Sequence, residues 1–214
     1  MDTQRMPSIG LALDDVVFCA LDIETTQVAG QPGALSVIEL AAQEFSGGRV
    51  TKPMFQTLVN PCCPIRPFDT KVSGITDNMV AGSPTFQDVY DDFLSYIDDR
   101  PLVAHNAPFD KRAIQSICST RNLEPPENIY IDTAAMLRKT IDLPKYSLEA
   151  AADYFRIPYK EKHRASGDCQ SVFHVFEALR VRLHGSHGIK TLGQLFDFLG
   201  METQPSGEQQ NLFG

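Results

Sequence analysis

The 214-residue chain lacks several features that would assign it to a broad class of protein. No apolar run approaches the roughly 18 residues of a membrane span, and the first ten residues hold no apolar core of signal-peptide length. Basic residues are not in excess: the net charge of −8 excludes the wide cationic surface by which general duplex-binding proteins hold nucleic acid. We therefore expect a cytoplasmic protein that makes no membrane contact.

Cysteine is also scarce in the arrangements that give it a structural role. The five cysteines are odd in number, and Cys62 and Cys63 are adjacent, which is a poor geometry for bridging each other. No Cys-x-x-Cys pair is present to hold zinc. The pattern excludes a disulfide framework and indicates reduced thiols, as in the cytoplasm.

Apolar residues make up 43% of the chain and charged residues 21%, which is typical of a globular protein with one substantial core. Alternating and helical periodicities predict strands first and then strands that alternate with helices, which indicates an α/β mixed sheet flanked by helices. Its first three strands would be antiparallel and the later ones parallel. The predicted strands are Val16–Ile23, Leu35–Phe45, Met54–Val59, Leu102–Ala104 and Ile129–Ile131, and the predicted helices are Phe86–Ile97, Pro108–Arg121, Thr133–Lys139, Ser147–Phe155, Gly167–Leu183 and Ile189–Leu199.

Four segments follow from these elements and from local composition. We expect an N-terminal extension over residues 1–12, a catalytic domain over 13–185, a short C-terminal helix within 186–200, and a flexible tail over 201–214. The tail is polar and contains Pro-Ser-Gly, which is typical of a segment without a core of its own.

Two carboxylates, Asp22 and Glu24, close the apolar run of the first predicted strand. Residues two apart on a strand point to the same face, so both side chains would project together. Buried carboxylates are unfavourable without compensation, which makes a cation site the first interpretation. The alternative is a strand end at which both acids reach water.

Two further acids and a histidine lie at other predicted element boundaries. Asp110 falls in the first turn of a helix for which Asn106 is the predicted cap and Pro108 a first-turn residue. Asp168 follows His163 by five residues, a spacing that lets the two converge only if His163 precedes the helix and Asp168 lies in its first turn. Each acid could instead complement its helix dipole, and Ser166 could cap the second helix.

The combined set suits hydrolysis of a phosphodiester with two divalent ions. Ligands that are all oxygen favour Mg²⁺ or Mn²⁺ over zinc, and two such ions can activate a water and stabilise the leaving oxygen. His163 could accept the proton of that water.

The order Asp22-x-Glu24, Asp110, His163-x4-Asp168 resembles the DEDDh 3′–5′ exonucleases, and most closely the proofreading epsilon subunits of bacterial DNA polymerase III. The resemblance covers roughly residues 16–183. It includes Val37-Ile38-Glu39-Leu40, Val72-Ser73-Gly74-Ile75-Thr76, the stretch from Val103 to Asp110, and Tyr146-Ser147-Leu148. It implies a ribonuclease H-like sheet.

By that resemblance, Asp22, Glu24, Asp110 and Asp168 would hold two Mg²⁺ or Mn²⁺ ions, and His163 would be the general base. The residues that the resemblance places at the terminal nucleotide are Thr25, Gly74, Ile75, Thr76, Asn106 and Phe109, although Phe109 could equally be a core residue. The loop from Gln27 to Ser36 is richer in glycine and proline than expected for the family, so no substrate contact is assigned to it.

The resemblance implies a 3′–5′ exonuclease that acts on single-stranded or frayed DNA ends in proofreading or repair. An RNA-trimming enzyme would use the same chemistry, and a non-catalytic module that binds a replication partner is the alternative of another class. The tail residues Gln209, Leu212 and Phe213 match short peptides that dock on the bacterial sliding clamp, and a solvated tail is the alternative there.

Overall fold

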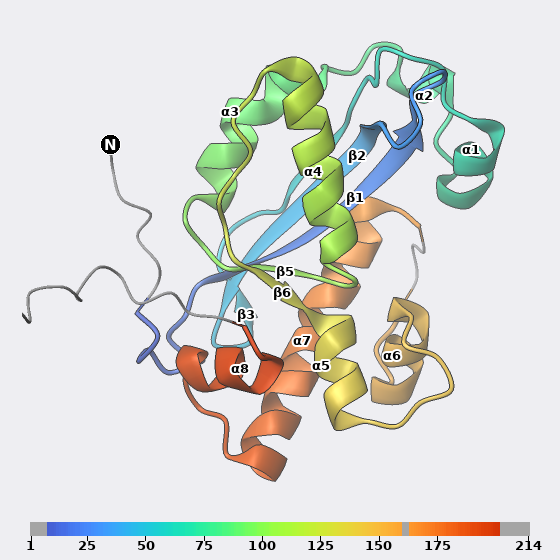
Figure 1. Ribbon diagram of the computed structural model, residues 1–214. Helices are drawn as coiled ribbons and strands as arrows, with labels where there is room; N and C mark the ends of the chain where they lie inside the picture. The colour runs from blue at the N-terminus through green and yellow to red at the C-terminus, as the bar shows by residue number, and fades with distance from the viewer. Residues whose placement is uncertain (1–7, 160–162, 202–214) are drawn as a thin grey trace, which may run out of the picture.

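The computed structural model describes residues 8–159 and 163–201. A six-stranded sheet forms its centre (Figure 1), with the strand order β3-β2-β1-β5-β6 and with β4 also paired to β2. The strands are β1 (Phe18–Gln27), β2 (Leu35–Ser46), β3 (Arg49–Val50), β4 (Phe55–Leu58), β5 (Leu102–Ala104) and β6 (Tyr130–Asp132).

Strand directions confirm the predicted mixed sheet. β2 pairs antiparallel with β1, β3 and β4, whereas β1–β5 and β5–β6 are parallel. The first strands are antiparallel because short connections join them: the 28–34 loop links β1 to β2, and the Gly47-Gly48 turn links β2 to β3. The parallel strands need helical crossovers, which α3 (Phe86–Ile97) and α4 (Pro108–Arg121) supply.

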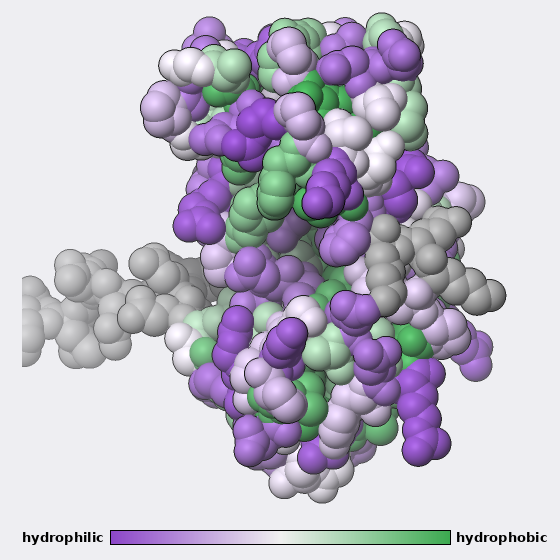
Figure 2. Space-filling model, turned by 90° about the vertical axis from the view of Figure 1, so that its right-hand side faces the viewer, coloured by the Kyte–Doolittle hydropathy of each residue, from purple (hydrophilic) through white to green (hydrophobic). Residues whose placement is uncertain are grey.

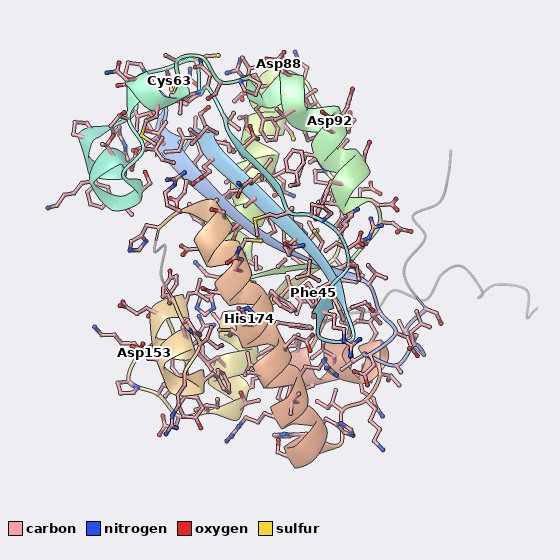
Figure 3. All side chains as sticks on the ribbon, turned by 180° about the vertical axis from the view of Figure 1, so that it is seen from behind. Phe45, Cys63, Asp88, Asp92, Asp153 and His174 are labelled. Carbon is pink, nitrogen blue, oxygen red and sulfur yellow. The ribbon has the colours of Figure 1, made fainter. Side chains whose placement is uncertain are left out.

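Helices cover both faces of the sheet. α3 and α4 bury Phe93, Ile114 and their neighbours against one face. α5 (Thr133–Thr140), α6 (Leu148–Phe155) and α7 (Ala165–His187) cover the other. Phe45 of β2 contacts two aromatic rings of α7, with centroid distances of 4.8 Å to Phe173 and 5.7 Å to Phe176 (Figure 3). The sheet is therefore held between two helical layers.

Two short helices, α1 (Pro67–Ser73) and α2 (Asp77–Val80), were not predicted. They are seven and four residues long, too short to show a helical repeat. Gly74 ends α1 with φ of 74°, a left-handed conformation that glycine adopts without strain.

The C-terminal helix α8 (Leu192–Leu199) matches the predicted element in place. Its Leu192, Leu195 and Phe196 belong to the same apolar cluster as α7. The segment before β1 is bonded to the start of α8, since Leu13 N donates to Lys190 O at 2.8 Å and Leu192 N donates to Leu11 O at 3.0 Å. Within the described ranges, no helix combines the length and apolar character needed to cross a bilayer.

Candidate active site

Alternation along β1 places Asp22 and Glu24 on the face covered by α7. Phe18 and Ala20 occupy the same row and belong to the apolar cluster that contains α7, so the next two members of the row replace apolar side chains by carboxylates. The prediction of a shared face is confirmed. The expectation of a strand end is wrong, because β1 continues to Gln27 in its pairing with β2.

The acids instead mark the point at which β1 loses its neighbour on the other side. β5 pairs with β1 only at Cys19 and Ala20. Beyond Ala20 that edge of β1 is free of β5, and the first turn of α4 follows β5 there (Figure 1). The carboxyl ends of parallel strands are where functional groups gather in α/β sheets.

Asp168 meets the two strand acids from the helical layer. It lies in the first turn of α7, while His163 precedes the helix, as the spacing predicted. Carboxylate oxygens of Asp22, Glu24 and Asp168 lie within 4.8 Å of one another. One oxygen of Asp168, Oδ1, is buried without a hydrogen-bond partner. Such an oxygen is unfavourable unless a cation or a water satisfies it.

Asp110 completes the group from α4. Its side chain is buried, with 5% of its surface exposed. Burial raises its pKa to about 8, with the charges of Asp132 and Glu24 contributing to that value. The α4 start differs from the prediction in one respect: Ala107, not Asn106, precedes the helix, and no side chain caps it. Asn106 has φ of 65°, and its backbone N–H donates to Asp132 Oδ1 at 2.8 Å.

The electrostatics of this group favour a bound cation. Burial raises the pKa of Asp22 well above its usual range, and the charges of Asp110, Asp168 and Glu24 add to this. Burial likewise raises the pKa of Glu24 to about 7, and the charge of Asp168 contributes. Asp168 has a raised pKa as well, mainly from burial. Four acids whose pKa values are raised by burial are relieved of an unfavourable charge when a cation binds, and together they offer an all-oxygen site to Mg²⁺ or Mn²⁺.

His163 is exposed, with φ of 58° in the left-handed region. It lies close enough to Asp168 for its charge to lower the pKa of that acid. The Asp168 carboxylate also accepts a hydrogen bond from Tyr159, a contact that the sequence did not indicate. The helix was predicted to begin at Gly167, but α7 begins at Ala165 and Gly167 lies in its first turn.

The residues predicted to contact a terminal nucleotide differ in how far they are exposed to solvent. Thr25 is partly exposed and follows a register shift in the β1–β2 pairing, and Gly74 and Thr76 are exposed beside α1 and α2. Phe109 is 36% exposed, so it is not a core residue. Figure 2, which faces the side carrying α1 above and α6 below, shows the surface hollowed between these two parts.

Ile75 does not fit its predicted role. Its side chain is fully buried in a small cluster with Ile38, Ile65 and Val80, so it supports the segment from within and cannot line a pocket. Asn106 is exposed and remains available to a ligand, although its predicted capping role is wrong.

Comparison with known proteins decides the family. The sequence pattern of the family described as Exonuclease (RNase_T) matches residues 19–176, which span every residue of the acidic group. This chain belongs to the exonuclease family. The resemblance found in the sequence is confirmed, and so is the divalent-metal chemistry at the level of the family.

Relatives within the exonuclease family are longer proteins. The chain is 32% identical over 179 residues to the PolC-type DNA polymerase III of Caldanaerobacter subterraneus, covering 83% of this chain and 12% of that protein. It is 31% identical over 207 residues to a putative bifunctional exonuclease/endonuclease of Mycobacterium tuberculosis, covering 92% and 32%. The chain thus spans about an eighth to a third of the length of these curated relatives.

Solved structures agree on the fold. Exonuclease X in complex with 5′-overhanging duplex DNA superposes with a TM-score of 0.63 at 26% identity, covering 86% of this chain and 99% of that one. The nuclease domain of 3′hExo, a DEDDh member bound to rAMP, gives 0.67 at 18% identity, covering 79% and 92%. E. coli Exonuclease I with a dT13 oligonucleotide gives 0.69 at 15% identity, covering 81% and 43%.

Proposed function

We propose that the protein is a metal-dependent 3′–5′ exonuclease that removes nucleotides from single-stranded or frayed DNA ends, in proofreading or repair. The observation that supports this most strongly is the convergence of Asp22, Glu24 and Asp168 oxygens within 4.8 Å, beside the buried Asp110. The buried Asp168 Oδ1 has no hydrogen-bond partner, which a bound cation would supply. In the exonuclease family such a site serves phosphodiester hydrolysis.

Asp22, Glu24, Asp110 and Asp168 are the residues that would hold two Mg²⁺ or Mn²⁺ ions. When bound, such ions lower the pKa of a coordinated water and neutralise charge that develops on the phosphate. His163 takes the proton of the attacking water, because an imidazole beside the site can accept a proton near neutral pH. Its exposed position before α7 leaves the ring nitrogens accessible to that water.

Substrate is held by groups around the hollow. Thr25 and Thr76 offer hydroxyl groups and Gly74 an exposed backbone to the terminal nucleotide. Phe109 offers an exposed aromatic face on which a base can stack. DNA is favoured because several relatives are DNA polymerases and Exonuclease X was solved with DNA. RNA is the second candidate, since 3′hExo of the same fold binds rAMP.

A 5′-labelled oligonucleotide assay tests this function. The full chain with Mg²⁺ or Mn²⁺ should give a ladder of 3′-shortened DNA products, which chelator or Asp22→Asn abolishes. Asp92→Asn, an exposed acid on α3 (Figure 3), is the matched control and should retain activity. A faster ladder from RNA of the same sequence would reassign the substrate. Intact DNA and RNA under all metal conditions would refute the proposal and favour a non-catalytic module.

For the tail we propose docking on a sliding clamp through Gln209, Leu212 and Phe213. These residues lie outside the described part of the chain, so the support is their sequence alone: two adjacent apolar anchors preceded by a glutamine. A cytoplasmic location also remains a prediction.

A further inference from the structure

Glu39 of β2 carries a carboxylate within the acidic site that the proposed chemistry does not use. It lies directly opposite Glu24 in the β1–β2 register, and its side chain is only 6% exposed. A fifth acid beside four others is electrostatically unfavourable, and its charge raises the pKa of Asp22 and Glu24. Packing alone does not explain it.

Both oxygens of Glu39 are engaged by one short segment. Oε1 accepts from Arg164 Nη2 at 2.7 Å, and Oε2 accepts from Arg164 Nε at 2.9 Å. Oε2 also accepts from the backbone N–H of Ala165 at 2.9 Å. Three donors leave little capacity for an ion, so Glu39 differs from Asp168, whose Oδ1 is buried without a partner. Glu39 is therefore no additional metal ligand.

The contact with Ala165 supplies what the start of α7 lacks. The residue before α7 is Arg164, and no local side chain caps the helix. The first N–H groups of a helix have no intrahelical partner, and an anion there is stabilising. Glu39 serves that purpose from a position 126 residues earlier in the chain.

The anchored segment connects the two functional residues of α7. Arg164 directly follows His163, and Ala165 lies three residues before Asp168. A two-pronged bond between a guanidinium and a carboxylate fixes orientation as well as distance. Fixing Arg164 and Ala165 onto β2 therefore sets where the chain leaves His163, and it sets the height and rotation of the first turn that carries Asp168.

We propose that Glu39 and Arg164 are positioning residues, which anchor the start of α7 to β2 so that His163 and Asp168 meet the acids of β1 in one fixed arrangement. This inference rests on the proposed function for its catalytic consequence, but not for the anchoring itself. Because the Arg164 side chain is 38% exposed, the ion pair contributes little stability, whereas its two parallel hydrogen bonds fix the orientation of the segment. A displacement near 1 Å can lower turnover about a hundredfold.

Amide hydrogen exchange of the full chain tests the anchoring without any need for activity. Glu39→Gln keeps the size of the side chain but places an amide NH₂ against Arg164. Exchange in residues 163–168 should accelerate about tenfold, while the rest of α7 is unchanged. The matched control is Glu177→Gln, which breaks the Glu177–Arg180 pair on the same helix (2.8 Å) away from the site. Unchanged exchange at 163–168 in Glu39→Gln would overturn the anchoring.

Kinetics on single-stranded DNA tests the consequence. Glu39→Gln should lower kcat about a hundredfold and change KM by less than roughly threefold, whereas Glu177→Gln should retain kcat. Arg164→Lys keeps the charge but loses the two-pronged bond, so it should lose kcat as well. In a His163→Ala background, Glu39→Gln should cause a smaller loss of kcat than in the wild type, because the base is already absent and only the placement of Asp168 is left to disturb.

The outcomes separate the two proposals. Multiplicative losses in the double variant, or a normal kcat in Glu39→Gln or Arg164→Lys, would overturn the positioning role. A wild-type protein without metal-dependent hydrolysis would refute the proposed function, and the anchoring would then stand or fall on exchange alone.

Discussion

The acidic site should make the metal-free protein less stable as pH rises, and divalent ions should reverse this. Glu24 and Asp110 have pKa values of about 7 and about 8 in the folded chain, against 4.5 and 3.8 for exposed groups. A raised pKa means that the folded state binds more protons than the unfolded state. The stabilising contribution is complete below pH 4 and is lost as pH rises through the folded values.

The useful window lies between pH 6.5 and 8. Burial lowers the pKa values of His105 and His174, so their protonation affects stability only below about 6.5. The lowered pKa values of Glu44, Asp69 and Asp88 act at still lower pH. Within the window, release of protons from Glu24 and Asp110 reduces the free energy of unfolding by about 2 kcal/mol.

Urea denaturation in chelator and in excess Mg²⁺ measures both effects. In chelator, stability should fall by about 2 kcal/mol from pH 6.5 to 8. Mg²⁺ binds the deprotonated acids, so at a hundredfold excess over its Kd it should add about 2.7 kcal/mol at pH 8 and much less at pH 6.5. Asp22→Asn should abolish the Mg²⁺ effect, whereas Asp92→Asn should change neither the fall in stability nor the gain from Mg²⁺.

Two results would refute the reasoning. The first is a stability in chelator that is constant or rises over this window. The second is an equal gain from Mg²⁺ in wild type and Asp22→Asn, which would place the ion elsewhere.

Three further outcomes are expected. His105→Ala should lower the free energy of unfolding by about 1–3 kcal/mol in urea, because its ring nitrogens bond Thr133 Oγ1 and Tyr146 O, both at 2.9 Å; the exposed His184→Ala should cost little, and equal losses would contradict this. Phe109→Ala should raise KM for DNA roughly tenfold through lost base stacking while the melting temperature stays constant, and an unchanged KM would exclude the stacking role. Replacing Leu212 and Phe213 by alanine should abolish clamp binding in a pull-down without altering nuclease rate, and undiminished binding would end the tail proposal.

Local rules account for the parts of the site that the sequence predicted. A period of two on β1 is enough to place Asp22 beside Glu24, and helical geometry is enough to put His163 before α7 and Asp168 in its first turn. The mixed sheet followed from the order of strands and helices.

Long-range contacts account for what the sequence did not predict. Asparagine is a common helix-capping residue, but the backbone N–H of Asn106 donates to Asp132 of β6. The left-handed φ of Asn106 is not the extended backbone of a capping residue. Ile75 looks like a pocket residue within an exposed segment, yet Ile38 and Val80 enclose it. Arg164 and Glu39 are 125 residues apart, so no local pattern could pair them.

The site exists because two neighbouring strands differ in length. β1 has ten residues and β5 only three, and their pairing ends at Ala20. If β5 continued for two more residues, its backbone would run beside Asp22, and the first turn of α4 could not bring Asp110 to that edge. Because β5 is short, the edge of β1 beyond Ala20 has no β5 partner, and this is where the apolar row of β1 is replaced by Asp22 and Glu24. No sequence motif indicates this edge. Four carboxylates from β1, α4 and α7 can then face one another, and the repulsion among them is what a divalent ion relieves.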